Sequence, residues 1–304
     1  MRYATKLNEY FSGDKTLFLI PLYQRSYAWQ RKHCERLFSD LEKVHNNHVY
    51  SHFFGSIVTV KASELEDDLL IIDGQQRITT ISLLILAAIH SVKNGQMKCE
   101  LGDEYISDQR NKYLVAKYRK GERKIKLRPI DNDIKAYDAL MADDVDQIVP
   151  ADKSGITSNF QLFCTLIKAS NMTFENLIEA VERLIVIDIR LDSNDNPQLI
   201  FESLNSCGKD LEEADKVRNY LLMSLTSEEQ EEYYRKYWRK IEENTDNDLI
   251  YAFLDYVLSD NRNRDKLKEL TEIHLREKEI SLEENPNLEE ENGNDDFEEP
   301  EDEE

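Results

Sequence analysis

A short apolar run that leads through a polar turn into a long apolar helix is the feature that most constrains the fold. Residues 69–88 read L-L-I-I-D-G-Q-Q-R-I-T-T-I-S-L-L-I-L-A-A. The run Leu69–Ile72 is bounded by polar residues and indicates a buried strand, whereas Ile78–Val92 has the length and composition of a buried helix. Gly74 permits a tight turn between them because it tolerates positive φ. The sequence therefore predicts a strand–turn–helix unit in a mixed α/β core.

The turn carries polar groups that suit an anion. A helix start presents unpaired backbone N–H groups and the positive end of the helix dipole, and Arg77 adds a planar, permanently charged phosphate binder. The other polar side chains here are Asp73, Gln75, Gln76, Thr79 and Thr80. Because a cation is unfavourable beside the dipole, removing Arg77 is expected to cost little stability. Two interpretations stay open: an anion site, or a cap at Asp73 with an ordinary ion pair for Arg77.

The surrounding pattern predicts an α+β protein. A helix is expected over 3–12, a strand over 16–20, a helix over 30–45 and a strand over 53–60. Beyond residue 98 the pattern is mainly helical, with short strands at 123–128 and 184–191. Helices are expected at 103–120, 134–141, 159–170, 174–183, 198–205, 211–225, 228–243, 249–258 and 266–279. The expected domains are thus an α/β core (1–98), a mainly helical region (99–280) and a tail (281–304).

Charge is distributed unevenly over the chain. Of the net charge of −22, thirteen acids and no Lys or Arg lie in residues 281–304, so this tail is expected to be disordered. The body is only mildly acidic, which argues against non-specific coating of nucleic acid but leaves a local basic groove open.

One basic stretch, residues 109–128, holds nine Lys or Arg and a single acid. It is a candidate phosphate-backbone surface, although a solvated helix and hairpin or a partner for the acidic tail would explain it equally. The DNA-binding candidates are Lys117, Arg119, Lys120, Arg123 and Lys124.

Several classes of protein are disfavoured by what the sequence lacks. The four cysteines form no C-x-x-C pair, which argues against a zinc ribbon, and no G-x-x-x-x-G-K-[ST] motif supports a P-loop enzyme. No apolar run approaches the roughly 20 residues that span a bilayer, and the N-terminus lacks a signal core, so a cytoplasmic protein without a membrane partner is expected. His45, His48 and His52 have a spacing that also describes a solvated helix face, and no metal site is assigned to them.

Two further segments combine polar and apolar residues in an unusual way. Ile20–Trp29 reads I-P-L-Y-Q-R-S-Y-A-W, in which Arg25 among aromatic rings can bind phosphate or carboxylate, or simply pair with an acid at the edge of the core. Residues 201–220 read F-E-S-L-N-S-C-G-K-D-L-E-E-A-D-K-V-R-N-Y, which also describes a helix–turn–helix corner with capping groups.

In this order, I-P-x-Y-Q-R-x-Y-x-W, D-G-Q-Q-R-x-T-T and F-x-x-L-N-x-x-G-x-x-L-x-x-A-D resemble the N-terminal domain of GmrSD-type restriction proteins, over residues 10–225. The resemblance implies a ParB/sulfiredoxin-like α/β core followed by a helical region. It also implies nucleoside triphosphate binding or hydrolysis linked to defence against phage or modified DNA. In ParB and sulfiredoxin relatives a related turn at a helix start binds nucleotide phosphates.

The resemblance suggests roles for the matching residues. Asp73 would hold Mg²⁺ or orient water, Gln75 or Gln76 would position the attacking water, and Arg77 would neutralise phosphates. The implied nucleotide-binding set is Tyr23, Gln24, Arg25, Gly74, Thr79 and Thr80.

No His-Asn-His nuclease motif is present, so a nuclease domain or subunit is an expected partner. Two alternatives stay open: a ParB-like nuclease that cleaves DNA itself, and a non-catalytic module that senses a nucleotide or a protein.

Overall fold

We describe the protein from a computed structural model. The structure describes residues 2–62, 68–118, 124–143, 148–191, 218, 222 and 227–240. The chain divides into two compact units, Met1–Leu211 and Glu212–Glu304. In the second unit, α10 (Ser227–Tyr233) continues into a π-helix (Tyr234–Trp238), and together they overlap the helix predicted over 228–243. Apart from residues 218 and 222, the predictions for 198–225 and 249–304 lie outside the described residues.

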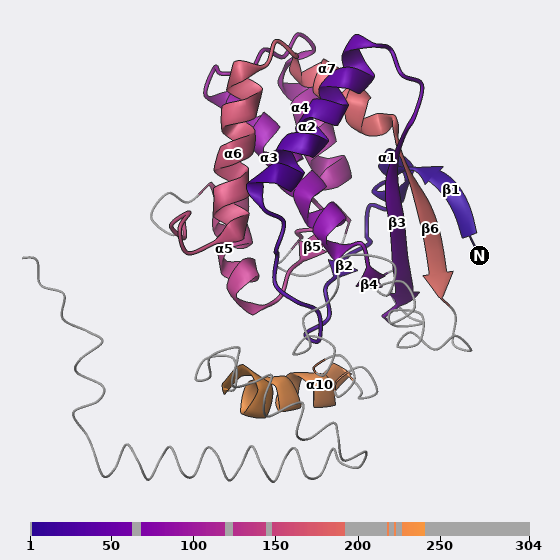
Figure 1. Ribbon diagram of the computed structural model, residues 1–304, viewed down its shortest axis with the longest axis vertical. Helices are drawn as coiled ribbons and strands as arrows, with labels where there is room; N and C mark the ends of the chain where they lie inside the picture. Colours follow the sequence, from indigo (N-terminus) through magenta and orange to yellow (C-terminus); the bar gives the residue numbers. More distant parts are fainter. Residues whose placement is uncertain are drawn as a thin grey trace, which may run out of the picture. The chain divides into compact units, whose positions relative to one another are not determined.

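A six-stranded mixed sheet organises the first unit (Figure 1), in the order β1-β6-β3-β4-β2-β5. β4 pairs in parallel with β2, which in turn pairs in parallel with β5, while β3 runs antiparallel to β4 and parallel to β6. The antiparallel strand β1 closes the other edge against β6. The strands are β1 (Arg2–Lys6), β2 (Phe18–Leu19), β3 (His52–Lys61), β4 (Leu69–Asp73), β5 (Leu127–Arg128) and β6 (Leu184–Leu191).

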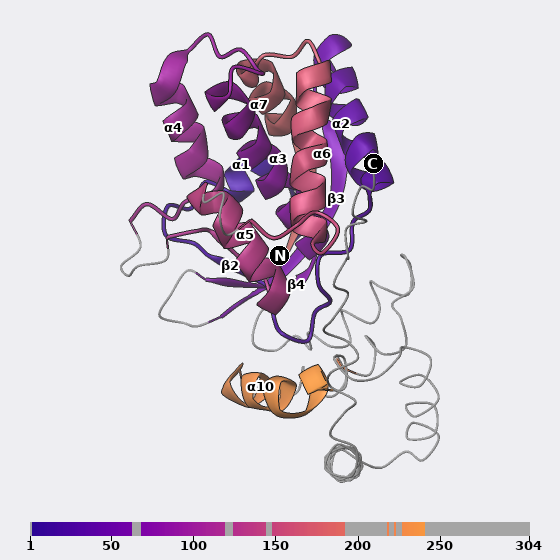
Figure 2. The ribbon, with the colours of Figure 1, turned by 90° about the vertical axis from the view of Figure 1, so that its left-hand side faces the viewer.

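The helices of this unit gather on one side of the strands β3, β6 and β1 (Figure 1), and Figure 2 views the molecule from that side. They are α1 (Leu7–Tyr10), α2 (Arg31–Asn46), α3 (Gln75–Lys93), α4 (Gly102–Tyr113), α5 (Asp131–Ala142), α6 (Gly155–Ala169) and α7 (Phe174–Glu182). α3 is buried along most of its length and packs chiefly on α6. Its apolar composition on every face is therefore what a central core helix requires.

The α+β class predicted from the sequence is confirmed by this sheet and its helical layer. The strand–turn–helix unit is present as β4, Gly74 and α3, with Gly74 in the left-handed region at φ 97°. The compact unit continues past residue 98, the expected end of the α/β core, because β6 lies between β1 and β3.

Two element predictions were wrong. Residues 3–12, expected to be one helix, form β1 and then the short helix α1, because β1 pairs with β6 over Arg2↔Ile189 to Lys6↔Ile185. The helix predicted to reach residue 120 ends at Tyr113, where the chain turns so that Val115 can bridge to Ile125.

Lys126, from the basic stretch, is buried and stabilises this turn. Its ammonium donates to the carbonyl oxygens of Phe11 and Lys112, each at 2.6 Å, and only 1% of the residue is exposed. Burial lowers the pKa of Lys126 to about 8. One cation of the basic stretch is therefore part of the core.

Within the described ranges, every helix is either too short or too polar to cross a membrane.

Candidate functional site

Three chain segments meet where the parallel strands β2, β4 and β5 end. Because these strands are parallel neighbours, their carboxyl ends lie at the same edge of the sheet, the place where ligands bind in sheets of this kind. We call this place the carboxyl edge. It is formed by residues 20–29 after β2, residues 74–80 after β4 and residues 129–133 after β5. The spacing of the motifs along the chain does not reveal this convergence.

The three segments enclose a cavity of about 10 Å³, roughly the space that one water molecule requires. Its lining contains two charged side chains, Arg25 and Asp133, and three other polar ones, Gln75, Gln76 and Thr79. The remaining lining residues are Ile20, Tyr27, Pro129 and Ile130. The first two sequence motifs are thus in contact around a single enclosed volume.

Gln76 ties the segment 24–29, which we call the Arg25 loop, to the start of α3. Its Oε1 accepts the N–H groups of Ala28 (2.8 Å) and Trp29 (3.2 Å), and its Nε2 donates to the carbonyl of Ser26 (3.2 Å). The residue is only 9% exposed. Both ends of the amide are therefore occupied by backbone, so this side chain holds the loop in place.

Gln75 and Gln24 make reciprocal contacts between the two motifs. Gln75 Nε2 donates to the carbonyl of Arg25 at 3.1 Å, and Gln24 Nε2 donates to the carbonyl of Ile72, in β4, at 2.7 Å. Both glutamines are buried. The Oε1 of Gln75 is a buried acceptor without a hydrogen-bond partner among the described residues, on a side chain that lines the cavity.

Tyr27 connects the Arg25 loop with two helices that the motifs did not include. Its hydroxyl lies 2.8 Å from Thr80 Oγ1 and accepts from Asn159 Nδ2 at 3.3 Å. The N–H of Tyr27 donates to Asp133 Oδ2 at 2.6 Å, and Asn159 also donates to the carbonyl of Trp29 at 2.6 Å. Sequence reasoning missed Asp133 and Asn159, because each is a single polar residue in a helical pattern.

Asp133 is a buried carboxyl group with a single hydrogen bond to offset the cost of burying its charge. It lies in the first turn of α5 and is 9% exposed. Burial raises its pKa to about 6, and the hydrogen bond from the Tyr27 N–H only partly opposes that shift. The fold therefore carries an ionisable group whose charged form is penalised near neutral pH.

We expect Asp133→Asn to stabilise the protein above pH 6 and to change little in acid. The folded pKa of about 6 exceeds the ordinary value of 3.8, so folding takes up a proton between these values and stability falls as pH rises through that window. The amide keeps an oxygen for the Tyr27 N–H and removes the charge. Urea unfolding should show a gain on the order of 2 kcal/mol at about pH 8 and almost none at about pH 4. An equal gain at both pH values would contradict this origin.

Arg25 differs from the other charged groups of the carboxyl edge. Its side chain lines the cavity and is half-buried, and no hydrogen bond or ion pair joins its guanidinium to another described residue. The alternative interpretation requires an acidic partner for Arg25, and none of the described residues is one. An unpaired guanidinium beside a helix start is suited to an anionic ligand.

Arg77 already has partners within the protein. Its Nη1 donates to the carbonyl of Ser56 at 2.9 Å and lies 3.7 Å from Asp73 Oδ2. The cap at α3 is Gly74, with no side-chain cap bond, so Asp73 does not cap the helix but does pair with Arg77. The expectation that removing Arg77 costs little stability must be revised, because its guanidinium bridges α3 to β3. Its side chain remains 31% exposed and can reach a ligand.

Arg77 lies directly against Gly55, so a side chain at position 55 is expected to be unfavourable. A Cβ at Gly55 would lie 2.6 Å from Arg77 Nε, and the backbone there has φ +121°. Gly55→Ala should therefore lower the free energy of unfolding by about 1–3 kcal/mol, chiefly because φ +121° is strained for any residue with a Cβ, while the flexible end of Arg77 has to move aside. Gly95→Ala is the matched control, because Gly95 also has positive φ (+67°) but open space around it. Equal losses on chemical unfolding would contradict the greater strain expected at Gly55.

The remaining candidates of the first two motifs are mostly inaccessible. Tyr23 and Thr79 are 4% and 2% exposed, and Thr80 is fully buried with its hydroxyl donating to the carbonyl of Gln76. A Cβ at Gly74 would meet the Ser56 carbonyl at 3.1 Å. These residues shape the turn, whereas Arg25, Asp73 and Arg77 are the motif side chains with charge and partial exposure.

The candidate DNA surface is described only in part. Lys117 and Lys124 are exposed, as expected, whereas Arg119, Lys120 and Arg123 lie outside the described residues. The third motif, residues 201–220, also lies outside them apart from Arg218.

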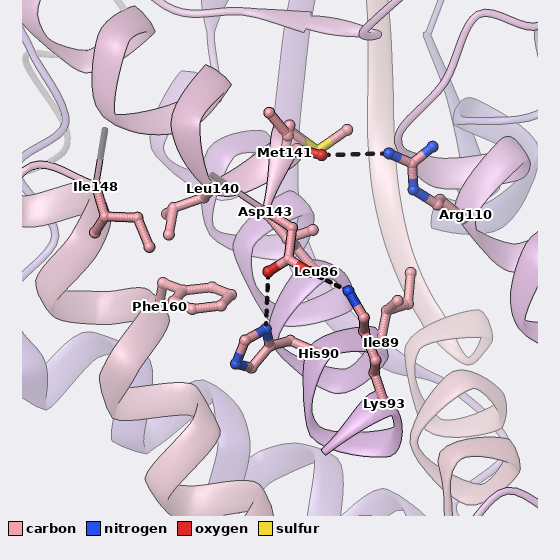
Figure 3. A pocket seen from close by; sticks show the side chains of 11 residues that line it. Leu86, Ile89, His90, Lys93, Arg110, Leu140, Met141, Asp143, Ile148 and Phe160 are labelled. Carbon is pink, nitrogen blue, oxygen red and sulfur yellow. Dashed lines mark hydrogen bonds and ion pairs between the residues drawn. The ribbon is translucent and has the colours of Figure 1, made fainter. Parts of the chain in front are cut away.

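A second hollow, of about 300 Å³, lies between α3, α5 and α6 (Figure 3). Its apolar wall includes Leu86, Leu140 and Phe160. Its charged groups face one another, because both His90 (at 3.6 Å) and Lys93 approach Asp143, while Arg110 donates to the carbonyl of Met141 at 3.4 Å. The hollow thus combines an ion pair between Lys93 and Asp143 with an arginine, Arg110, whose described partner is a carbonyl.

Within the described ranges, no three His, Cys, Asp or Glu side chains are grouped as a metal site would require. Of the histidine cluster, His52 lies 3.8 Å from Asp40 across α2 and β3.

The fold and the carboxyl edge define a class: an α+β domain whose polar site lies where parallel strands end and a buried helix begins. Residues 7–222 match the family described as GmrSD restriction endonuclease, N-terminal domain. The match covers most of the chain, and the chain therefore belongs to this family. This membership places it among components of restriction-like defence systems. No curated protein is significantly similar to it.

Proposed function

We propose that this domain binds a nucleoside triphosphate at the carboxyl edge and hydrolyses it, as the nucleotide-dependent component of a restriction-like system. The observation that carries the proposal is the position of Arg25. The hydrogen bonds of Gln75 and Gln76 hold the Arg25 loop on the first turn of α3, so that a guanidinium without a partner among the described residues lies beside a helix start. A polyphosphate supplies the negative charge that such an arrangement favours.

The side chains divide into two roles in this proposal. Arg25 and the exposed part of Arg77 neutralise phosphate oxygens, while backbone N–H groups at the α3 start hold them. Gln24 and Gln76 position the loop, since their amides are used by backbone groups. The cavity is too small for a nucleotide, so the phosphates would occupy the outer side of the edge, where Asp73 and Arg77 are partly exposed.

Mg²⁺ would accompany the triphosphate. Mg²⁺ usually keeps several waters and is held by one or two carboxylates together with substrate phosphates, so a dedicated cluster of acids is not required. Asp73, with a partly exposed carboxylate next to Arg77, fits that limited role. The ion would supply charge neutralisation of the phosphates, which is a large part of what phosphoryl transfer needs.

DNA and a nuclease domain or subunit are the proposed partners. Lys117 and Lys124 are exposed on either side of the bridge between Val115 and Ile125, which supports a backbone contact near this turn. In this account nucleotide turnover regulates cleavage that another domain or subunit performs.

The test is phosphate release with each of the four nucleoside triphosphates, with and without DNA. Arg25→Ala should abolish phosphate release from at least one nucleoside triphosphate that the wild type hydrolyses. Arg31→Ala is the control, because Arg31 is an exposed arginine that pairs with Glu35 in α2 and does not line the cavity. Saturable binding without release would favour the sensing module, and cleavage of DNA by this chain alone would favour the nuclease alternative.

A further inference from the structure

The cavity at the carboxyl edge contains two unsatisfied acceptors that the proposed phosphate site does not use. Gln75 Oε1 has no hydrogen-bond partner among the described residues, and Gln75 is only 6% exposed. Asp133 accepts the Tyr27 N–H through Oδ2, and no other described residue donates to its carboxylate. Both residues line the same volume of about 10 Å³. A water there would have two acceptors for its two hydrogens.

The carboxylate of Asp133 is more than the local structure needs. Holding the Tyr27 N–H requires one oxygen acceptor, which an asparagine would provide without the cost of burying a charge. Arg25 lines the cavity too, but no ion pair joins it to Asp133 in the structure, so a salt bridge does not account for the buried charge. A buried, unpaired carboxylate at such a site is typical of a group with a chemical role.

We propose that Asp133 is the general base of the nucleotide hydrolysis, and that Gln75 Oε1 orients the water it activates. The assignment rests on the proposed function above. The water oxygen forms a bond to the γ-phosphorus, and the bond from that phosphorus to the β–γ bridging oxygen breaks. The nucleoside diphosphate leaves with that electron pair, and one water proton passes to the Asp133 carboxylate and then to solvent. Arg25, which lines the same cavity, would hold the γ-phosphate at the cavity mouth, next to this water.

The other titratable groups around the cavity are not suited to act as the base, which supports the assignment of that role to Asp133. Burial raises the pKa of the Tyr27 phenol far above neutrality, so that it remains protonated, and its hydroxyl is engaged with Thr80 and Asn159. Arg25 stays cationic at any relevant pH. Among the described cavity-lining residues, Asp133 is thus the group that can take up a proton near neutral pH.

The test compares Asp133→Asn with Asp108→Asn, an exposed aspartate of α4. Phosphate release and equilibrium binding of a non-hydrolysable triphosphate analogue are measured for both, with DNA present. For Asp133→Asn we expect release to fall by about 10²–10⁴-fold while analogue binding stays within about threefold of wild type. Asp108→Asn should leave both unchanged. The acid limb of the wild-type pH–rate profile should also disappear in whatever activity Asp133→Asn retains.

Gln75→Ala provides the second arm. It removes the acceptor for the water and also the hydrogen bond to the Arg25 carbonyl, so turnover should fall more than analogue binding, which loses loop positioning alone. Release by Asp133→Asn within about threefold of wild type would overturn the assignment and leave the nucleotide site intact. Parallel loss of binding and release would also overturn it, because Asp133 would then act only through the position of Tyr27. Failure of the wild type to bind any triphosphate would instead overturn the proposed function itself.

Discussion

Gln76→Ala is expected to lower the free energy of unfolding by about 2–4 kcal/mol, which is large for a single polar side chain. The amide makes three hydrogen bonds to the backbone of the Arg25 loop, and its removal leaves the N–H groups of Ala28 and Trp29 without that acceptor. It also leaves a cavity beside the start of α3, because Gln76 is buried. Urea unfolding followed by circular dichroism measures the change.

Gln161→Ala is the control for that substitution. Gln161 is also a helical glutamine, in α6, but it is exposed, so its loss should change stability by less than about 0.5 kcal/mol. Similar losses for the two variants would contradict the conclusion that Gln76 holds the loop on α3.

Arg77→Ala should abolish nucleotide turnover and should also destabilise the protein measurably. Loss of charge-assisted contacts to phosphate is expected to weaken nucleotide binding by about 1.5–3 kcal/mol. The hydrogen bond to the Ser56 carbonyl adds a stability cost of about 1 kcal/mol, which the sequence alone did not indicate. Arg77→Lys should recover only part of the binding, since an ammonium cannot contact two oxygens in one plane. Calorimetric binding and thermal unfolding separate the two effects.

Two outcomes for Arg77→Ala would count against the proposal. If the variant unfolds, the bridge between α3 and β3 is the main role of Arg77. If it folds and hydrolyses nucleotide at the wild-type rate, the phosphates do not bind at this turn. Arg31→Ala, in which an exposed ion pair with Glu35 is lost, shows how much an arginine substitution changes by itself.

Elements with their own periodicity could be predicted from the sequence. The helix over 30–45 is α2 (Arg31–Asn46), and the strand over 184–191 is β6, because the apolar spacing in each matches the face it buries. β1 could not be predicted in this way. Residues 2–6 lack an alternating pattern, and they form a strand because β6, far away in the sequence, offers an edge to pair with.

The candidate site was predicted only in part for a related reason. The motif turn at Asp73–Arg77 was identified from its residues, and the positive φ at Gly74 agrees with that interpretation. The roles within it depend on partners from other segments. Gln76 holds a loop because residues 26, 28 and 29 return to it, and Asp133 reaches the same cavity only because β5 lies beside β2. Such pairings arise from the topology of the sheet, which residue spacing does not encode.

Hydrogen–deuterium exchange, with and without a non-hydrolysable nucleoside triphosphate analogue and Mg²⁺, tests the central claim most directly. The account predicts slower exchange in peptides that cover residues 20–29 and 74–80, because ligand contacts there would order the Arg25 loop and the first turn of α3. Peptides that cover residues 86–93 and the end of α5, around the second hollow, should exchange at the same rate in both conditions. Protection around the second hollow, with the carboxyl edge unaffected, would contradict the account.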